Sequence, residues 1–180
     1  MTEDKKKGKT WPSFISSLLF WGGILILVTL DQVSKFLAAL YLKGTDGIVL
    51  IPGLLKLQYL ENRGMAFGML QGKQMIFIIF CLIFLGIIFF IFYRIPKKRY
   101  YLPLIVTGAV LAGGAAGNFI DRLVYGYVID FIYLVVIDFP IFNIADIYVV
   151  SGGIALATVI LFRYKDQDFA FLGSGPKRKG

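Results

Sequence analysis

The chain has 180 residues, of which 58% are hydrophobic and only 17% are charged, and its formal net charge at pH 7 is +8. In soluble domains about a quarter of the residues are charged, so this composition argues against a water-soluble protein. Histidine is absent and Cys81 is the single cysteine, which excludes Ser-His-Asp and Cys-His catalysis, histidine-ligated zinc and an intrachain disulfide. The basic residues lie between long apolar runs, unlike the basic stripes of a nucleic-acid-binding domain. We therefore expect a membrane protein with no nucleic-acid partner.

Four apolar segments are long enough to cross a bilayer core of about 30 Å as helices. They cover approximately residues 14–38, 75–93, 102–120 and 144–162. Lysines precede the first segment as in a secretory signal peptide, but its apolar run is longer than in such a peptide and no clear cleavage site follows. We interpret the first segment as a retained span, so that residues 1–180 form a single membrane domain.

Lysine and arginine are concentrated in the N-terminal tail, the connection after the second span and the tail after the fourth span, which together hold 13 of the 19 basic residues. The positive-inside rule predicts that these three segments, and hence both termini, are cytoplasmic. Two loops, at about residues 44–72 and 121–143, then face outward. Residues 173–180 are rich in Gly, Pro, Lys and Arg, which is typical of a disordered tail.

Two further patterns refine the fold. In the first outer loop, two β-rich runs flank Pro52-Gly53, which predicts a small sheet on the outer membrane face. In the third span, Gly113 and Gly117 form a small-residue repeat that favours close helix packing. The expected fold class is an all-α membrane protein with four transmembrane helices and a small extracytoplasmic β-sheet.

Five aspartates lie at the outer ends of the spans or in the second outer loop: Asp31, Asp121, Asp130, Asp138 and Asp146. A carboxylate in a membrane segment costs a few kcal/mol and is by default a functional hypothesis. Asn118 and Asp121 end the third span, and Asn143 and Asp146 open the fourth, so each pair lies on one helix face. Two antiparallel helices would bring these two amide and carboxylate pairs to a similar depth.

Without histidine, two carboxyl groups that share a water molecule are the simplest hydrolytic device. One carboxyl stays protonated near neutral pH while the other acts as a base toward water that attacks a peptide carbonyl. Asp146 and Asp130 are the leading candidates, and Asp130 lies in a run too apolar for an ordinary solvated loop. Composition alone does not choose the pair, because each aspartate could also be a membrane-interface carboxylate with a basic partner.

Two aspartates have basic neighbours that suggest other roles. The charge of Arg122 would hold the adjacent Asp121 ionised, which suits an orienting role better than a shared proton. Lys35 follows Asp31 by one helical turn, and that pair could simply anchor the first helix at the interface.

Five short blocks follow one another along this four-span layout. They are Asp31-Gln32-x-x-Lys35, Asn62-x-Gly64-x-Ala66-Phe67-Gly68, Gly113-Gly114-Ala115-x-Gly117-Asn118-x-x-Asp121-Arg122, Val128-x-Asp130-Phe131-Ile132 and Phe142-Asn143-x-Ala145-Asp146. In these blocks the chain resembles the bacterial lipoprotein signal peptidases (signal peptidase II), and the similarity runs from Asp31 to Gly152. Met65 and Ile147 depart from the family pattern.

The resemblance implies that Asp130 and Asp146 are catalytic. It also implies a set of residues that line or support the substrate site, namely Asn62, Gly64, Asn118, Asp121, Arg122, Asn143 and Ala145. Asp31 and Lys35 would be structural.

The implied activity is removal of a prolipoprotein signal peptide just before a cysteine that carries diacylglycerol, without a metal or an organic cofactor. The implied location is the bacterial cell membrane, with the active site at the extracytoplasmic face, and the expected partners are lipidated prolipoproteins and membrane lipids around a monomer. The alternative is a four-span subunit of a proton- or cation-coupled transporter, since intramembrane carboxylates also build ion pathways. The clustering of the acids on one side of the membrane disfavours that alternative.

Overall fold

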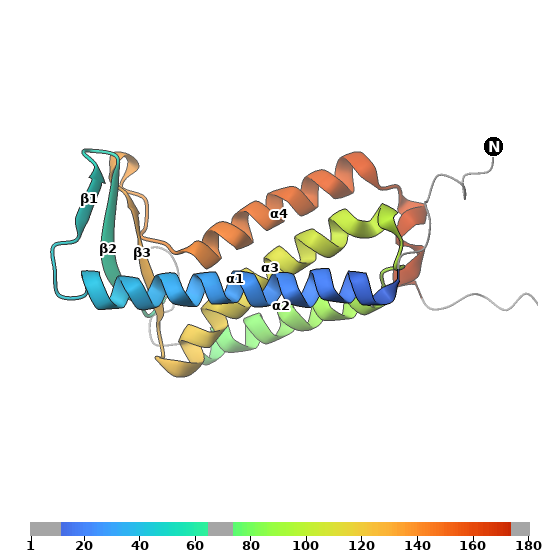
Figure 1. Ribbon diagram of the computed structural model, residues 1–180, viewed down its shortest axis with the longest axis horizontal. Helices are drawn as coiled ribbons and strands as arrows, with labels where there is room; N and C mark the ends of the chain where they lie inside the picture. Colours follow the sequence, from blue (N-terminus) through green and yellow to red (C-terminus); the bar gives the residue numbers. More distant parts are fainter. Residues whose placement is uncertain (1–11, 65–73, 174–180) are drawn as a thin grey trace, which may run out of the picture.

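The computed structural model describes residues 12–64 and 74–173 (Figure 1). Within these residues, four helices are long and apolar enough to cross a membrane. They are α1 (Ser13–Leu42), α2 (Gln74–Arg94), α3 (Leu102–Val124) and α4 (Ile144–Arg163). The four helices run along the long axis of the molecule, and a small sheet lies across one end of the bundle (Figure 1). The expected fold of four membrane-spanning helices with a small sheet is confirmed.

Helix α3 is the central helix of the bundle and packs against the other three. In its most apolar window 56% of the residues are buried, against 11–17% in the other helices, whose outer faces remain apolar and exposed. Small residues allow this close approach. A Cβ on Gly113 would meet the side chain of Leu27 at 2.9 Å, and one on Gly114 would meet the backbone oxygen of Ala145 at 2.6 Å. The predicted small-residue packing of α3 is therefore confirmed.

The sheet is antiparallel and has three strands in the order β1 (Ile48–Ile51), β2 (Leu55–Asn62) and β3 (Val128–Leu134). The turn between β1 and β2 contains Gly53, whose φ of 72° favours glycine. The predicted hairpin of the first outer loop is present, but β3 was not predicted as a strand. Its first four residues are all buried, so the run lacks the polar and apolar alternation of a half-exposed strand.

The register between β2 and β3 determines which residues of the two strands lie side by side. Leu60 pairs with Asp130 and Asn62 pairs with Val128, so the end of β2 lies beside the aspartate of β3. Phe131 of β3 packs with Ala38 and Leu42 at the end of α1, which holds the sheet against the bundle.

Helix α3 continues to Val124, four residues past the predicted span, so Asp121 and Arg122 lie in a helix and not in an outer loop. The last described segment, Asp166–Leu172, forms 3-10 turns that pack against the bundle end opposite the sheet (Figure 1). The predicted disordered tail lies outside the described residues except for Gly173. Met65 and the motif positions 66–68 lie outside them as well.

Candidate active site

Asp130 in β3 and Asp146 in the first turn of α4 are joined through one residue, Asn143. The Asn143 Nδ2 donates to Asp130 Oδ1 at 2.6 Å, and its backbone N–H donates to Asp146 Oδ2 at 3.1 Å. Asn143 is the N-cap of α4, and its side-chain oxygen accepts from the backbone N–H of Asp146 at 3.0 Å. This capping box holds Asp146 at the helix start, beside the strand that carries Asp130.

The other two predicted asparagines complete the shell around the carboxyl groups. Asn62 Nδ2 donates to Asp130 Oδ2 at 2.7 Å, and Asn118 Nδ2 donates to Asp146 Oδ1 at 2.7 Å. All four carboxyl oxygens of Asp130 and Asp146 therefore accept a hydrogen bond from an uncharged amide. The contact between Asn118 and Asp146 confirms that the ends of the third and fourth spans meet at one depth.

The two carboxyl groups differ in their surroundings. Asp130 is 1% exposed, whereas Asp146 is only partly buried. Burial and, to a smaller extent, the nearby charge of Asp146 raise the pKa of Asp130 to about 7, although the hydrogen bonds from Asn62 and Asn143 oppose the rise. Asp130 thus titrates near neutral pH, as a carboxyl that donates a proton in that range must.

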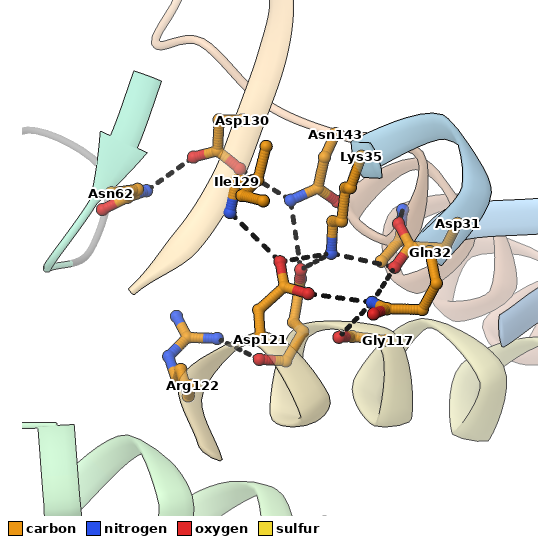
Figure 2. Close-up of polar contacts among 12 residues, drawn as sticks. Asp31, Gln32, Lys35, Asn62, Gly117, Asp121, Arg122, Ile129, Asp130 and Asn143 are labelled. Carbon is orange, nitrogen blue, oxygen red and sulfur yellow. Dashed lines mark hydrogen bonds and ion pairs between the residues drawn. The ribbon is translucent and has the colours of Figure 1, made fainter. Parts of the chain in front are cut away.

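Behind this pair lies a buried ionic cluster, which consists of Asp31, Lys35 and Asp121 (Figure 2). Lys35 Nζ lies 2.8 Å from Asp31 Oδ2 and 3.0 Å from Asp121 Oδ2, and the three side chains are at most 2% exposed. Lys35 also donates to Asn118 Oδ1 at 2.9 Å. Charges this deeply buried are stable only when they are paired and hydrogen-bonded, as these are.

One expectation about these charges is wrong and another is incomplete. Arg122 does not face Asp121, because consecutive residues on a helix point in different directions, and the cation beside Asp121 is Lys35 of α1. The guanidinium of Arg122 instead donates to the backbone oxygen of Asn118 at 3.2 Å and lies over the Phe77 ring, 5.0 Å from its centroid. Asp31 and Lys35 do form the expected i,i+4 ion pair, but the pair is buried and shared with Asp121 of α3, so it does more than anchor the first helix at the interface.

Two apolar grooves meet at Asp146 and Arg122. The outer groove, of about 630 Å³, lies beside the sheet and is lined among others by Asn62, Gly64, Asp130, Phe139, Phe142 and Asp146. The membrane groove, of about 540 Å³, lies between α2 and α4 and is lined among others by Phe80, Cys81, Phe84, Asn118, Asp146 and Val150. Cys81 is thus a partly exposed groove residue. Another cavity, of about 170 Å³, lies away from these carboxyl groups and has an apolar lining.

Sequence reasoning missed two residues of the site. Gln32 Nε2 donates to Asp121 Oδ1 at 2.8 Å and to the backbone oxygen of Gly117 at 3.2 Å. A Cβ on Gly117 would collide with the Asp31 carboxylate, so this glycine makes room for the buried ionic cluster as well as for helix packing. Gln32 stands in one of the family blocks, which was the available signal. Asp138 lies apart from the site, exposed in the following loop with Tyr133 as its partner.

The chain is similar to known proteins over most of its length. A family model described as signal peptidase (SPase) II matches residues 23–162. A lipoprotein signal peptidase of Syntrophomonas wolfei is 42% identical over 149 residues, which cover 83% of this chain and 97% of that protein. A lipoprotein signal peptidase of Streptococcus pyogenes is 37% identical over 155 residues, which cover 84% and 96%.

Two solved structures of bacterial membrane enzymes are also similar. Their TM-scores are 0.73 and 0.72 at 33% and 35% identity, and the matches cover 88% and 87% of this chain and 96% and 98% of theirs. The transporter alternative finds no support in these comparisons. The chain belongs to the signal peptidase II family of membrane aspartyl proteases.

Proposed function

We propose that this enzyme hydrolyses prolipoproteins just before a cysteine that carries diacylglycerol. The two carboxyl groups that perform the reaction are those of Asp130 and Asp146, here called the dyad. The observation that carries the proposal is that both carboxyl groups line one apolar groove and are joined by the buried Asn143. Membership of the signal peptidase II family supports the removal of signal peptides from prolipoproteins.

In the proposed reaction Asp130 begins protonated and Asp146 begins ionised. Asp146 takes a proton from water as the water oxygen bonds to the peptide carbonyl carbon, while Asp130 donates its proton to the carbonyl oxygen. When the C–N bond breaks, Asp130 recovers a proton from a hydroxyl of the diol, and Asp146 gives its proton to the leaving nitrogen. This cycle restores both carboxyl groups and forms no acyl-enzyme.

The proposed roles of the two aspartates follow from the different surroundings of their carboxyl groups. A buried Asp130 with a pKa of about 7 is suited to carry the proton, and Asp146, which is partly exposed and lines both grooves, is suited to activate water. Asn62, Asn118 and Asn143 hold the carboxyl oxygens without adding charge.

The remaining site residues act around the dyad. Gly64 gives its N–H to the side-chain oxygen of Asn62 at 3.0 Å, and Ala145 gives its N–H to Asp31. Arg122 lines both grooves and presents its guanidinium to polar groups of the substrate. Asp121 orients the start of β3 through the backbone N–H of Ile129.

The proposed topology places the sheet and the dyad at the extracytoplasmic face of a bacterial cell membrane, with both termini cytoplasmic. Arg94 and the connection at residues 97–99 supply a basic surface at the end of α2, which the positive-inside rule assigns to the cytoplasm. The acyl chains of a lipidated cysteine would then remain in the bilayer while its peptide bond reaches the dyad. Every dyad and amide residue comes from one chain, so a monomer suffices.

The substrate is tested with two synthetic peptides that differ only in the diacylglyceryl group on cysteine. Purified protein in detergent is incubated with each peptide, and the products are identified by mass spectrometry. We expect cleavage before the lipidated cysteine, and little cleavage of the unmodified peptide. Equal cleavage of both peptides would contradict the lipid requirement, and a cut at another bond would contradict the proposed substrate. Asp138→Asn, a change of an exposed aspartate outside the site, serves as the matched control and should cleave normally.

A further inference from the structure

The buried ionic cluster reaches both halves of the dyad through the backbone. Asp31 Oδ1 accepts a hydrogen bond from the N–H of Ala145, at 3.0 Å. Asp121 Oδ2 accepts one from the N–H of Ile129, at 3.1 Å (Figure 2). Ala145 and Ile129 are the residues immediately before the two dyad aspartates. Each buried carboxylate therefore holds the chain one residue away from a reacting group.

One ammonium group connects these two carboxylates. Lys35 Nζ lies 2.8 Å from Asp31 and 3.0 Å from Asp121, on two different helices. A single lysine thus holds two carboxylates, and each of these carboxylates holds one of the two segments that carry the dyad. Substitution of Lys35 by an uncharged residue would leave two buried carboxylates with no cation between them, which is strongly unfavourable.

The remaining hydrogen bond of Lys35 acts on the dyad through an amide. Lys35 donates to Asn118 Oδ1 at 2.9 Å, and Asn143 Nδ2 donates to the same oxygen at 3.1 Å. With its oxygen held on that side, the Asn118 amide presents Nδ2 to Asp146 Oδ1, at 2.7 Å. The orientation of the Asn118 amide is therefore set by Lys35 together with Asn143.

We propose that Lys35 is a positioning residue for hydrolysis, which fixes the relative placement of the dyad and contributes a balancing charge. This inference rests on the proposed catalytic roles of Asp130 and Asp146. Lys35 lines neither the outer groove nor the membrane groove, so it acts through other residues and not on the substrate. A placement error of about 1 Å in a reacting group can lower a rate about 100-fold.

The charge of Lys35 also bears on proton transfer. The ionisable groups that face Lys35 or its partners are Asp31 of α1, Asp121 and Arg122 of α3, Asp130 of β3, and Asp146 and Tyr148 of α4. The positive charge of Lys35 lowers the pKa of Asp130, so its removal raises that pKa. Removal of the ammonium should therefore move the pH profile of turnover toward higher pH.

The test compares Lys35→Met with Lys43→Met, a matched control just past the end of the same helix. Lys43 is exposed, pairs with Glu61 at 2.9 Å, and lines neither the outer groove nor the membrane groove. For each variant, kcat, KM and the pH profile are measured on the lipidated peptide and normalised to folded protein, which is quantified by circular dichroism and gel filtration. Lys35→Met should lose about 10- to 100-fold in kcat with KM within about threefold, and its profile should shift upward. Lys43→Met should behave as the unchanged protein.

A charge-restoring variant separates positioning from stability. In Lys35→Met/Asp31→Asn the number of uncompensated carboxylates falls by one, and the introduced asparagine retains an oxygen that can accept from Ala145. We expect partial recovery of kcat and return of the pH profile toward its original position. A merely structural lysine would lower the thermal midpoint and leave kcat per folded molecule and the pH profile unchanged, which would overturn the proposal.

If Lys35→Met does not fold, Lys35→Arg and Asp31→Asn provide the test. Arginine keeps the charge but not the three ammonium hydrogen bonds, so kcat should fall with little shift of the profile. Asp31→Asn removes a negative charge and should shift the profile downward. Folded variants with unaltered kcat and profiles would overturn the proposal. Asp130→Asn and Asp146→Asn are assayed in parallel, because turnover in these variants would instead reject the dyad itself.

Discussion

Asn143 donates a 2.6 Å hydrogen bond to Asp130 from the N-cap position of α4, so one side chain both starts a helix and holds a carboxyl on the neighbouring strand. The same residue contacts Asp146 with its backbone N–H. The geometry of the dyad is therefore a property of the junction between β3 and α4, and neither segment could produce it alone.

Substitution of Asn143 can separate these two tasks. Asn143→Ser keeps an N-cap oxygen but is too short to hold Asp130, so it should retain most of the stability while kcat falls about tenfold or more. Asn143→Ala should lose the activity and also about 1 kcal/mol of stability. Thermal unfolding and kcat are measured on both variants. Equal stability of the two variants would contradict the capping role, and normal turnover by Asn143→Ser would contradict the role in orienting Asp130.

The pH dependence of turnover tests the proton on Asp130. Burial raises the pKa of this carboxyl to about 7, so its protonated form persists up to neutral pH and is lost above it. If the protonated form is required, kcat should fall as the pH rises through about 7, with apparent pKa values that belong to the pair.

Asn62→Leu sharpens this test. The hydrogen bond from Asn62 favours the ionised form of Asp130, and leucine removes this bond while it keeps a similar side-chain volume. The substitution should therefore raise the pKa of Asp130 and move the descending limb of the pH profile to higher pH. The measurement is kcat against pH for both proteins. A descending limb that moves to lower pH would contradict the assignment of the proton to Asp130.

Glycine at position 117 is required by the buried ionic cluster. A Cβ there would collide with the carboxylate of Asp31, so Gly117→Ala should cost about 1–3 kcal/mol and reduce kcat by displacing the cluster. Gly86 of α2 has nothing within 4 Å of an added Cβ, and Gly86→Ala should be neutral or slightly stabilising. Thermal midpoints and kcat of the two variants are compared. Similar behaviour of both would show that Asp31 tolerates displacement.

The orientation in the membrane is tested by cysteine labelling in a Cys81→Ala background. Single cysteines at the exposed positions Asp46 and Asp138 should react with an impermeant maleimide added to intact cells, because these positions flank the sheet. A cysteine at the exposed position Arg99 should react only after the membrane is permeabilised. Labelling at position 99 in intact cells would reverse the proposed topology.

The sequence predicted those parts of the fold that leave a local signal. The four helices were recognisable because each has a long apolar run, and the first hairpin because Pro52 and Gly53 separate two β-rich runs. Strand β3 was missed because both of its faces are buried at its start, and a buried strand has no alternation.

The site was only partly accessible to sequence reasoning. Helical spacing brought Asn118 and Asp146 together correctly, since each lies on a helix end of known periodicity. The pairing of Lys35 with Asp121 was missed because it joins α1 to α3, and contacts between distant segments leave no periodic pattern. The adjacent Arg122 was the misleading local alternative.

The central claim is that Asp130 and Asp146 perform the hydrolysis as one unit. The direct measurement is the cleavage rate of the diacylglyceryl-cysteine peptide by Asp130→Asn, Asp146→Asn and the double variant, each first verified as folded and able to bind the peptide. Asparagine keeps the shape of aspartate but can neither ionise nor transfer the proton, so each single variant should lose turnover, and the double variant should be scarcely worse. Near-normal turnover by Asp130→Asn together with complete loss in Asp121→Asn would contradict the account and make Asp121 and Asp146 the pair to test.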